Sequence, residues 1–433
     1  MSAGLMTQVA CVVGVDLGST TSKAVVLDLD GKVLGKGITN SRSSYDRAVE
    51  LARVEAFVAA RFQVLQRAVE HVAGKQALAR LLGAFRLEQH LVQLDQLRVG
   101  LEREVRLHVL PDAREAVSAA VSGILARMRA EEEKRFDAPT PEERSDFFRD
   151  AASSAYARIA ESTAAEKGLS FDQLLSLFDK CIIQVENAPL ELGFLDHIDA
   201  ALKRCESDRA LREGVEAAVS TEFDLRATVG TGYGRARLPF PKEQIRSEIL
   251  CHGLGAHAMF PGTRTVLDIG GQDTKAIQVD DQGIVTSFQM NDRCAAGSGR
   301  YLGYIADEMN LGLHELGPLA EKGVHPVKIN STCTVFAGAE LRERLSLGDK
   351  REDILAGLHR AIMLRAMSLL ARSGGIQDEF TFTGGVARNH AAVTALRRLV
   401  EEHYGPRTLN ISPDSIYTGA LGAALFAQRI AAS

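Results

Sequence analysis

Two short glycine-containing segments of this chain combine residue types that can hold a polyphosphate. In residues 14–23 (GVDLGSTTSK), Asp16 ends a buried strand-like run and a small hairpin follows it. Backbone N–H groups in such a turn can face phosphate oxygens because no bulky side chain blocks their approach. A carboxylate at this point can hold Mg²⁺, usually through water molecules. The same plan recurs in residues 268–275 (DIGGQDTK), so two hairpins could grip one polyphosphate from both sides.

A third glycine junction, TGGVARN at residues 383–389, follows a strand-like segment late in the chain. A purine and its ribose could lie flat against the backbone there. No G-x-x-x-x-G-K-[S/T] segment is present, which excludes a Walker-type site, and GSG at residues 297–299 lacks the third glycine of a dinucleotide motif. A single hairpin could be purely structural, but three such junctions in this order indicate a nucleotide site.

Cys294 and Cys333 are the cysteines whose surroundings favour chemistry. Each lies at or near the predicted N-terminus of a helix, where the partial positive charge favours the thiolate. A [4Fe-4S] cluster takes four thiolates, so two cysteines per chain suffice when two chains share the cluster at a symmetry axis. Without Cys-x-x-Cys clustering, an ordinary role stays open for both. We expect ordinary core or surface roles for the other four: Cys11, Cys181, Cys205 and Cys251.

The elements that must position these residues follow from the apolar pattern. Strands are predicted at residues 11–15, 23–28, 32–38, 264–269, 275–279, 284–289 and 380–383. The Asp30-Gly31 pair is a strong hairpin signal between the second and third of them. Residues 41–215 instead carry apolar residues at helical spacing. The chain therefore contains a weak internal duplication of a strand–turn–strand unit, with a helical block inserted in its first half.

Composition excludes several functional classes. The 433 residues are 45% apolar and 25% charged, which is ordinary for a globular chain of two or three structural units. The net charge of −5 offers no basic footprint for nucleic acid or for an acidic membrane. We find no signal peptide and no run near the roughly 20 apolar residues that span a bilayer. Scattered cysteines favour a reducing compartment, so we expect a cytoplasmic protein that binds neither nucleic acid nor membrane.

Together these motifs resemble the BadF/BadG/BcrA/BcrD-type ATPase family, which includes activators of 2-hydroxyacyl-CoA dehydratases and ATP-binding subunits of benzoyl-CoA reductase. The resemblance is carried by residues 14–23, 231–235, 268–275, 291–302, 331–336 and 383–389. It implies an α/β, actin-like fold shared with acetate and sugar kinases and heat-shock chaperones. That fold has two ribonuclease-H-like domains with ATP in the cleft between them, and here a large α-helical insertion in the first domain.

The resemblance also implies domain boundaries. The first actin-like domain would take its N-terminal strands from residues 1–40, and the helical insertion would cover residues 41–215. Residues 216–258 would complete the first domain and add a connecting helix. Residues 259–411 would form the second domain, with the cluster cysteines and the adenosine motif. The C-terminal helix, residues 412–433, would return to the first domain.

Roles for individual residues follow from the same resemblance. Cys294 and Cys333 match the two cluster ligands that each subunit contributes. Asp16 matches the Mg²⁺-site carboxylate and Asp268 opens the second phosphate hairpin. Glu248, on a connecting helix predicted over residues 244–257, is the candidate for positioning the attacking water, with an ordinary surface glutamate as the alternative. The expected nucleotide contacts are Gly18, Ser19, Thr20, Thr21, Lys23, Gly270, Gly271, Gln272, Asp273, Gly384, Gly385 and Asn389.

The insertion makes the chain look most like the larger ATP-binding subunit of benzoyl-CoA reductase, to which residues 40–45 and 144–150 also look similar. We therefore expect an ATP-dependent oxidoreductase subunit that couples ATP hydrolysis to low-potential electron transfer from ferredoxin. Expected partners are a shorter homologous ATPase subunit that shares the [4Fe-4S] cluster, and two substrate-reducing iron–sulfur subunits. Two alternatives stay open: an ATP-dependent activator of a 2-hydroxyacyl-CoA dehydratase, and a small-molecule kinase of the same fold. The residues do not distinguish benzoyl-CoA from substituted benzoyl-CoA, or a homodimer from a heterodimer.

Overall fold

The computed structural model describes residues 7–41, 44–69, 74–136, 147–188, 191–205, 209–291, 298–309, 311–329 and 334–432. The chain divides into two compact units, which we call unit 1 and unit 2. Unit 1 comprises residues 1–9 and 37–224, and unit 2 comprises residues 10–36 and 225–433. Both phosphate hairpins and the third glycine junction belong to unit 2. The domain boundaries implied by the resemblance stay predictions.

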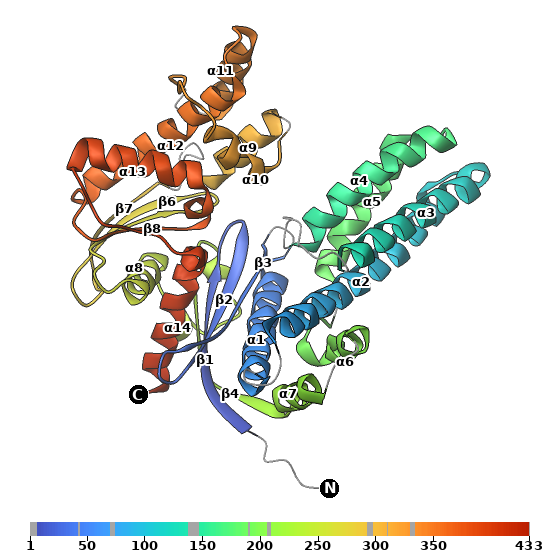
Figure 1. The fold of residues 1–433 in the computed structure, drawn as a ribbon, viewed down its shortest axis with the longest axis horizontal. Helices are drawn as coiled ribbons and strands as arrows, with labels where there is room; N and C mark the ends of the chain where they lie inside the picture. The colour runs from blue at the N-terminus through green and yellow to red at the C-terminus, as the bar shows by residue number, and fades with distance from the viewer. Residues whose placement is uncertain are drawn as a thin grey trace. The chain divides into compact units, whose positions relative to one another are not determined.

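The first sheet contains the three strands predicted near the N-terminus. It has four strands in the order β3-β2-β1-β4: β1 (Thr7–Leu17), β2 (Thr21–Asp28), β3 (Val33–Asn40) and β4 (Thr221–Thr231). β1 and β2 pair antiparallel up to Leu17 opposite Ser22, which places residues 18–20 at the tip of the first hairpin. Gly31 takes φ +84° in the turn between β2 and β3, a conformation that glycine adopts without strain. The three consecutive predicted strands are confirmed (Figure 1).

The second sheet repeats the strand–turn–strand plan. Its five strands lie in the order β7-β6-β5-β8-β9: β5 (Thr265–Ile269), β6 (Thr274–Val279), β7 (Val285–Asn291), β8 (Phe380–Thr383) and β9 (Leu409–Asn410). β5 pairs antiparallel with β6, so residues 270–273 form the tip of the second hairpin. β8 runs parallel to β5 with Thr383 opposite Asp268. The third glycine junction therefore leaves the sheet directly beside the second hairpin.

Helices cover both faces of the second sheet. α8 (Glu248–Met259) packs on one face with Val266, and α12 (Arg351–Ser373) packs on the other with Leu267. Successive side chains of a strand point to opposite faces, so covering both faces buries every residue of β5. The other helices after β7 are α9 (Gly299–Glu308), α10 (Leu313–Ala320), α11 (Thr334–Ser346), α13 (His390–Tyr404) and α14 (Thr418–Ala431).

α12 is, among the described residues, the one helix long and apolar enough to cross a membrane by length and composition. It packs against β6, β7, α10 and α13, and 61% of its most apolar window is buried inside unit 2. Core helices of globular units have this character because every face meets another element. The apolar composition of α12 is thus accounted for by its packing.

α8 and α14 cross in direct backbone contact in unit 2 (Figure 1). A Cβ at Gly422 would collide with the carbonyl oxygen of Cys251, and one at Gly255 would collide with that of Thr418. α14 also lies against β1, where a Cβ at Gly14 would meet the backbone of Ala420. These glycines bring the helix that carries Glu248 close to β1, the strand that carries Asp16.

We expect Gly422→Ala to lower the free energy of unfolding by about 1–3 kcal/mol, the usual cost of overpacking a close contact. The clash with the Cys251 carbonyl outweighs the roughly 1 kcal/mol that alanine contributes through its helix propensity. Urea denaturation followed by circular dichroism measures the change. Gly303→Ala is the matched control, because a Cβ at this helical glycine of α9 meets nothing within 4 Å. Equal stability of both variants would contradict the close crossing.

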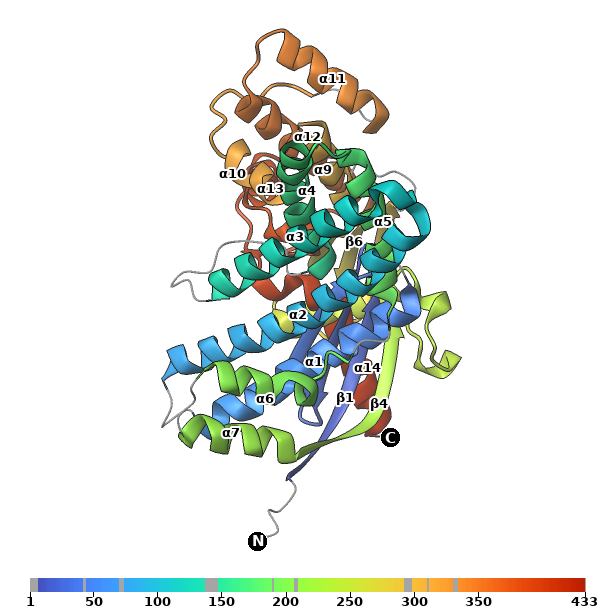
Figure 2. The same ribbon diagram turned by 90° about the vertical axis from the view of Figure 1, so that its right-hand side faces the viewer.

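The helical block of unit 1 contains two cores that share one long helix (Figure 2). Its helices are α1 (Tyr45–Val69), α2 (Lys75–His108), α3 (Pro111–Phe136), α4 (Phe148–Lys167), α5 (Phe171–Asn187), α6 (Phe194–Arg204) and α7 (Arg209–Ser220). The first part of α2 packs with α1, α6 and α7 around the rings of Phe62, Phe85 and Phe194. The later part of α2 packs with α3, α4 and α5 around Tyr156 and Phe178.

The predicted helical character of this block is confirmed for its described residues, with a shifted end. α7 continues to Ser220 and β4 begins at Thr221, whereas the sequence pattern predicts the end of the block at residue 215. Arg61 explains the extension, because its guanidinium donates to the carbonyl oxygens of Ala218 and Thr221 and so caps the last turn of α7. Such a cap from a distant helix leaves no signal in the local pattern.

Candidate active site

The two phosphate hairpins meet at their tips within unit 2. A Cβ at Gly271 would collide with the hydroxyl of Thr20 and would lie 3.7 Å from that of Ser19. Ser19, Thr20, Gly270 and Gly271 are each partly accessible, so their backbone groups can reach a ligand. Sequence reasoning expected facing hairpins, and the structure brings these four residues together. Gln272 is also partly accessible at the second tip.

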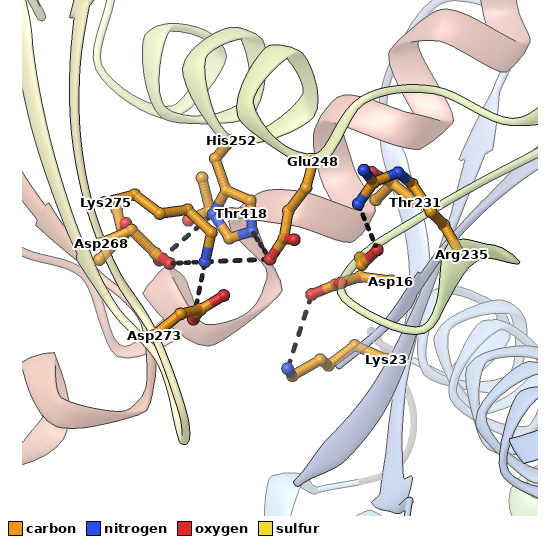
Figure 3. A network of polar contacts seen from close by, with 12 residues as sticks. Asp16, Lys23, Thr231, Arg235, Glu248, His252, Asp268, Asp273, Lys275 and Thr418 are labelled. Atoms are coloured by element: carbon orange, nitrogen blue, oxygen red, sulfur yellow. Dashed lines mark hydrogen bonds and ion pairs between the residues drawn. The ribbon is translucent and has the colours of Figure 1, made fainter. Parts of the chain in front are cut away.

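Asp16, the residue before the last one of β1, has a buried carboxylate of which only one oxygen has a partner. Its side chain lies almost entirely out of solvent, with Oδ2 3.5 Å from Lys23 Nζ (Figure 3). Oδ1 has no hydrogen-bond partner. Two glycines leave room around it, because a Cβ at Gly232 would lie 2.5 Å from Oδ1 and one at Gly419 would lie 3.0 Å from Oδ2. A buried carboxylate oxygen without a partner, next to the partly accessible tip of the first hairpin, fits a Mg²⁺ ion held through water.

Behind the second hairpin, one buried ammonium group joins three carboxylates. Lys275 Nζ lies 3.1 Å from Asp268 Oδ2, 2.9 Å from Glu248 Oε1 and 2.9 Å from Asp273 Oδ1 (Figure 3). Glu248 is the first residue of α8 and is 6% exposed, so the surface-glutamate alternative is wrong. The predicted helix over residues 244–257 is shifted, because residues 242–244 form a separate 3₁₀ turn and α8 spans Glu248–Met259.

The charged groups of this cluster shift one another's pKa values. Burial lowers the pKa of Lys275, but Asp268, Glu248 and Asp273 together raise it well above the usual value. Burial raises the pKa of Asp268, but the neighbouring His252 and Lys275 hold it well below its usual range. For Glu248 burial prevails and raises the pKa, although Lys275 opposes the shift. These directions keep Lys275 charged and Asp268 ionised inside the cluster.

His252 closes the cluster from the next turn of α8. Its Nδ1 lies 3.2 Å from Asp268 Oδ1 and its Nε2 lies 3.9 Å from Glu248 Oε1. Burial lowers the pKa of His252, but the charge of Asp268 outweighs burial and raises it. Thr383 Oγ1, at the end of β8, donates to Asp268 Oδ1 at 2.9 Å. Asp268 is thus held by side chains from three elements besides its own strand.

The third glycine junction combines one residue in a left-handed conformation with a helix cap. Gly384 has φ +86°, and a Cβ there would collide with the carbonyl oxygen of Ile269, so the junction lies against β5. Gly385 begins a 3₁₀ turn, and Asn389 caps α13 by accepting a hydrogen bond from Ala392 N at 3.1 Å. The Asn389 amide also lies 3.1 Å from His359 Nε2. These contacts give Asn389 a structural role, and its contact with nucleotide stays a prediction.

The predicted cluster ligands Cys294 and Cys333 lie outside the described residues. The helices that follow them pack together, with an Arg342–Glu308 ion pair joining α11 to α9. The start of α9 is bonded to the second phosphate hairpin: Gly299 N donates to Gly270 O at 2.8 Å and Arg300 N donates to Gly271 O at 2.7 Å. Within the described part of the chain, no group of three or more His, Cys, Asp or Glu side chains could hold a metal ion.

The four remaining cysteines have the ordinary surroundings that were expected. Cys11, Cys181 and Cys251 are buried and Cys205 is half-buried, and none of the four is in a disulfide. Burial raises the pKa of Cys181 and of Cys251 to about 12, which keeps both thiols protonated and unreactive near neutral pH.

Comparison with known proteins identifies the family. The model of the BadF/BadG/BcrA/BcrD ATPase family matches residues 13–427, which include both hairpins and the third junction. The chain belongs to the BadF/BadG/BcrA/BcrD ATPase family. The resemblance drawn from the motifs is confirmed, and membership of this ATPase family makes the chain an ATP-binding, ATP-hydrolysing enzyme.

Relatives within the BadF/BadG/BcrA/BcrD ATPase family support the activator alternative better than the expected reductase subunit. The (R)-2-hydroxyglutaryl-CoA dehydratase activating ATPase of Acidaminococcus fermentans is 42% identical over 224 residues, which cover 52% of this chain and 84% of the relative. A subunit of the benzoyl-CoA reductase of Thauera aromatica is 32% identical over 207 residues, which cover 48% of this chain and 72% of the relative. About half of the chain therefore lies beyond what either relative matches.

The crystal structure of component A of the Acidaminococcus fermentans (R)-2-hydroxyglutaryl-CoA dehydratase shows the same fold. It matches with a TM-score of 0.52 and 26% identity, covering 98% of this chain and 100% of that one. The expected actin-like α/β fold is confirmed, and the two sheets of this chain each contain the strand–turn–strand plan.

Sequence reasoning missed three residues of this BadF/BadG/BcrA/BcrD-type site: Lys275, His252 and Thr383. Lys275 carried a signal, because a lysine inside a buried strand requires anionic partners. The carboxylates of residues 268 and 273 nearby were candidates for those partners. His252 carried no comparable signal, since a histidine one turn beyond Glu248 is equally common on a surface.

Proposed function

We propose that this chain is an ATP-dependent activator that delivers low-potential electrons to a 2-hydroxyacyl-CoA dehydratase. The observation that carries the proposal is the 42% identity to a dehydratase activating ATPase, which covers 84% of that relative. The contact between the two phosphate hairpins supports it, because a polyphosphate needs donors on more than one side. Such a dehydratase needs an electron at very low potential, and ATP hydrolysis supplies the driving force that an ordinary donor lacks.

In this proposal the described residues bind the triphosphate and prepare the attacking water. Backbone groups at Gly18–Thr21 and Gly270–Asp273 hold the phosphates, and the third junction receives the nucleoside. Asp16 would hold Mg²⁺ through water, and the bound ion would offset the negative charge of the phosphates. Glu248 orients the water that attacks the terminal phosphate, since a carboxylate within hydrogen-bond reach can accept from it. Lys275, His252 and Thr383 contact the Asp268 carboxylate at the start of the second hairpin.

The link between hairpin and α9 offers a route from nucleotide to redox site. Hydrogen bonds join Gly270 and Gly271 to the first two residues of α9, whose sequence begins five residues after Cys294. A shift of the hairpin when the triphosphate binds or is cleaved would therefore move α9. Because α11 packs on α9 and follows Cys333, both cysteine-bearing segments would respond together.

Cys294 and Cys333 are the proposed thiolate donors for one [4Fe-4S] cluster shared with a second protein chain. Two thiols per chain fit half of the four that such a cluster takes. When bound, the cluster supplies a one-electron carrier whose potential depends on charge and hydrogen bonding around its sulfurs. The second chain is a copy of this one or a shorter homologue, ferredoxin is the donor, and the assembly acts in the cytoplasm.

A second candidate, the ATP-binding subunit of a benzoyl-CoA reductase, is supported by the 32% identity to one subunit of such an enzyme. The helical block of unit 1 would then dock the two substrate-reducing subunits. A small-molecule kinase is the candidate from another class. These candidate functions differ in the number of ATP molecules consumed per molecule of product formed.

Anaerobic co-expression with the neighbouring genes, followed by iron, sulfide and ATPase assays, tests the proposal. An activator is expected to carry iron and sulfide and to consume less than one ATP per dehydrated product, because one injected electron serves many turnovers. A fixed ATP requirement for every reduced product would assign the reductase role instead. Phosphate transfer to a metabolite by an iron-free protein would overturn both redox assignments.

A further inference from the structure

Lys275 carries a buried ammonium group in unit 2. Only 1% of this residue is exposed, and its Nζ lies within 3.1 Å of carboxylates from three different segments. Asp268 belongs to β5, Asp273 to the tip of the second hairpin, and Glu248 to the first turn of α8. One side chain therefore ties the sheet, the hairpin and the connecting helix to a single point.

The Asp268 and Glu248 carboxylates differ in how far their positions depend on Lys275. Asp268 also receives Thr383 Oγ1 and the His252 ring, so its position does not depend on Lys275 alone. Glu248 has the His252 ring at 3.9 Å, beyond hydrogen-bond distance, and Lys275 at 2.9 Å. Of these two neighbours, Lys275 is thus the group that can fix the Glu248 carboxylate in one orientation.

We propose that Lys275 is a positioning residue for ATP hydrolysis, which acts by holding the Glu248 carboxylate in the orientation needed to align the attacking water. Because Lys275 follows the second hairpin along β6, it also makes the orientation of Glu248 depend on the conformation of that hairpin. Hydrolysis is then fast only when the hairpin holds its nucleotide correctly. The inference rests on the role given to Glu248 under the proposed function.

The expected kinetic effect lies in kcat and not in binding. Lys275 has its three charge partners inside the cluster and does not depend on nucleotide for them. Lys275→Met is therefore expected to lower the kcat of ATP hydrolysis by about a hundredfold, the scale of a misaligned reacting group. The KM for ATP and the Kd for ADP are expected to stay within about twofold of the parent values, the spread of an unaffected site.

A double-mutant cycle separates positioning through Glu248 from a general structural effect. Glu248→Gln, Lys275→Met and the double variant are compared by steady-state ATPase rates. In the Glu248→Gln background, Lys275→Met is expected to have an effect within about twofold of none, because the group it positions is already altered. Full multiplication of the two single effects would overturn the proposal.

A pH profile gives a second readout that a merely structural lysine would not move. Glu248 faces Lys275, Asp273, His252 and Asp16, and of these Lys275 exerts the largest charge effect. Its positive charge lowers the pKa of Glu248, so Lys275→Met is expected to move the acid limb of the kcat profile to higher pH. Lys275→Arg keeps the charge but not the geometry, and is expected to lower kcat with the acid limb in place.

Two controls keep the experiment decisive. Lys36→Met removes a lysine that pairs with Asp414 on the surface of unit 2 and is expected to leave kcat unchanged. If Lys275→Met does not fold, the same cycle with Lys275→Arg is judged by the same criterion.

A parental rate for Glu248→Gln would reject the water-positioning role in the proposed function. An impaired Glu248→Gln with additive Lys275 effects would reject this inference alone.

Discussion

Asp16→Asn is expected to lower the kcat of ATP hydrolysis by about a hundred- to a thousandfold, the usual loss when one preorganised electrostatic group is removed from a reacting phosphate. The Oδ1 atom of Asp16 is buried without a partner in a space bounded by Gly232 and Gly419. An asparagine amide fills the same space without the negative charge that Mg²⁺ requires. Phosphate release measured at saturating MgATP gives kcat, and titration with Mg²⁺ gives the apparent metal affinity.

The matched control for this prediction is Asp30→Asn. Asp30 lies exposed in the turn between β2 and β3, so its substitution removes one carboxylate from the same sheet without touching the hairpin tips. Asp30→Asn is expected to hydrolyse ATP at the parental rate. Parental kcat and Mg²⁺ affinity in Asp16→Asn would show that this carboxylate is not the metal site, even if the nucleotide binds between the hairpins.

Cys294→Ser and Cys333→Ser are each expected to abolish the bound iron and sulfide of anaerobically purified protein. A [4Fe-4S] cluster shared by two chains loses one ligand from every chain that carries the substitution, and serine is a poor replacement for a thiolate. Nucleotide affinity is expected to stay close to the parental value, because the phosphate hairpins are assembled by contacts within unit 2. Iron and sulfide assays, the visible absorption of the cluster and ADP titration measure these effects.

Cys205→Ser is the matched control, since Cys205 is the half-buried free thiol at the end of α6 in the helical block. It is expected to keep full iron content. Unchanged iron in Cys294→Ser would remove this cysteine from the ligand set. Alkylation at neutral pH adds an independent check, because the raised pKa values of Cys181 and Cys251 leave these thiols unreactive. Modification of Cys294 and Cys333 is expected only after the cluster is removed, because thiolates that bind the cluster are not available to the reagent.

The sequence predicted the sheets and hairpins of this protein well because their signals are local. β1 and β2 pair on either side of a short glycine-containing turn, and β5 and β6 repeat this plan around residues 270–273. Helix boundaries were less predictable. α8 begins only after a separate 3₁₀ turn at residues 242–244. The end of α7 is capped by the guanidinium of Arg61, which belongs to α1, a helix far away in sequence.

Candidate site residues that lie in turns could be proposed from the sequence. Residues that contact one another across different helices and strands could not. The residue types and the spacing of Asp16, Gly18 and Gly270 were sufficient to propose them as site residues. Asn389 was expected at the nucleotide, but its side chain caps α13 and contacts His359, a use that spacing alone does not reveal. The expected reductase subunit rested on the helical insertion and on residues 40–45 and 144–150, whereas identity over the aligned residues favours the dehydratase activators.

The order and composition of the glycine turns, read from residues alone, determined the family, the fold and the nucleotide chemistry of this protein. Only the tertiary structure decided that Glu248 is buried, that Lys275 joins three carboxylates, and that α9 is bonded to the second hairpin. The reason is physical: turn conformation depends on neighbouring residues in the chain. The pairing of buried charges depends instead on which distant segments the packed core brings within a few ångströms of each other.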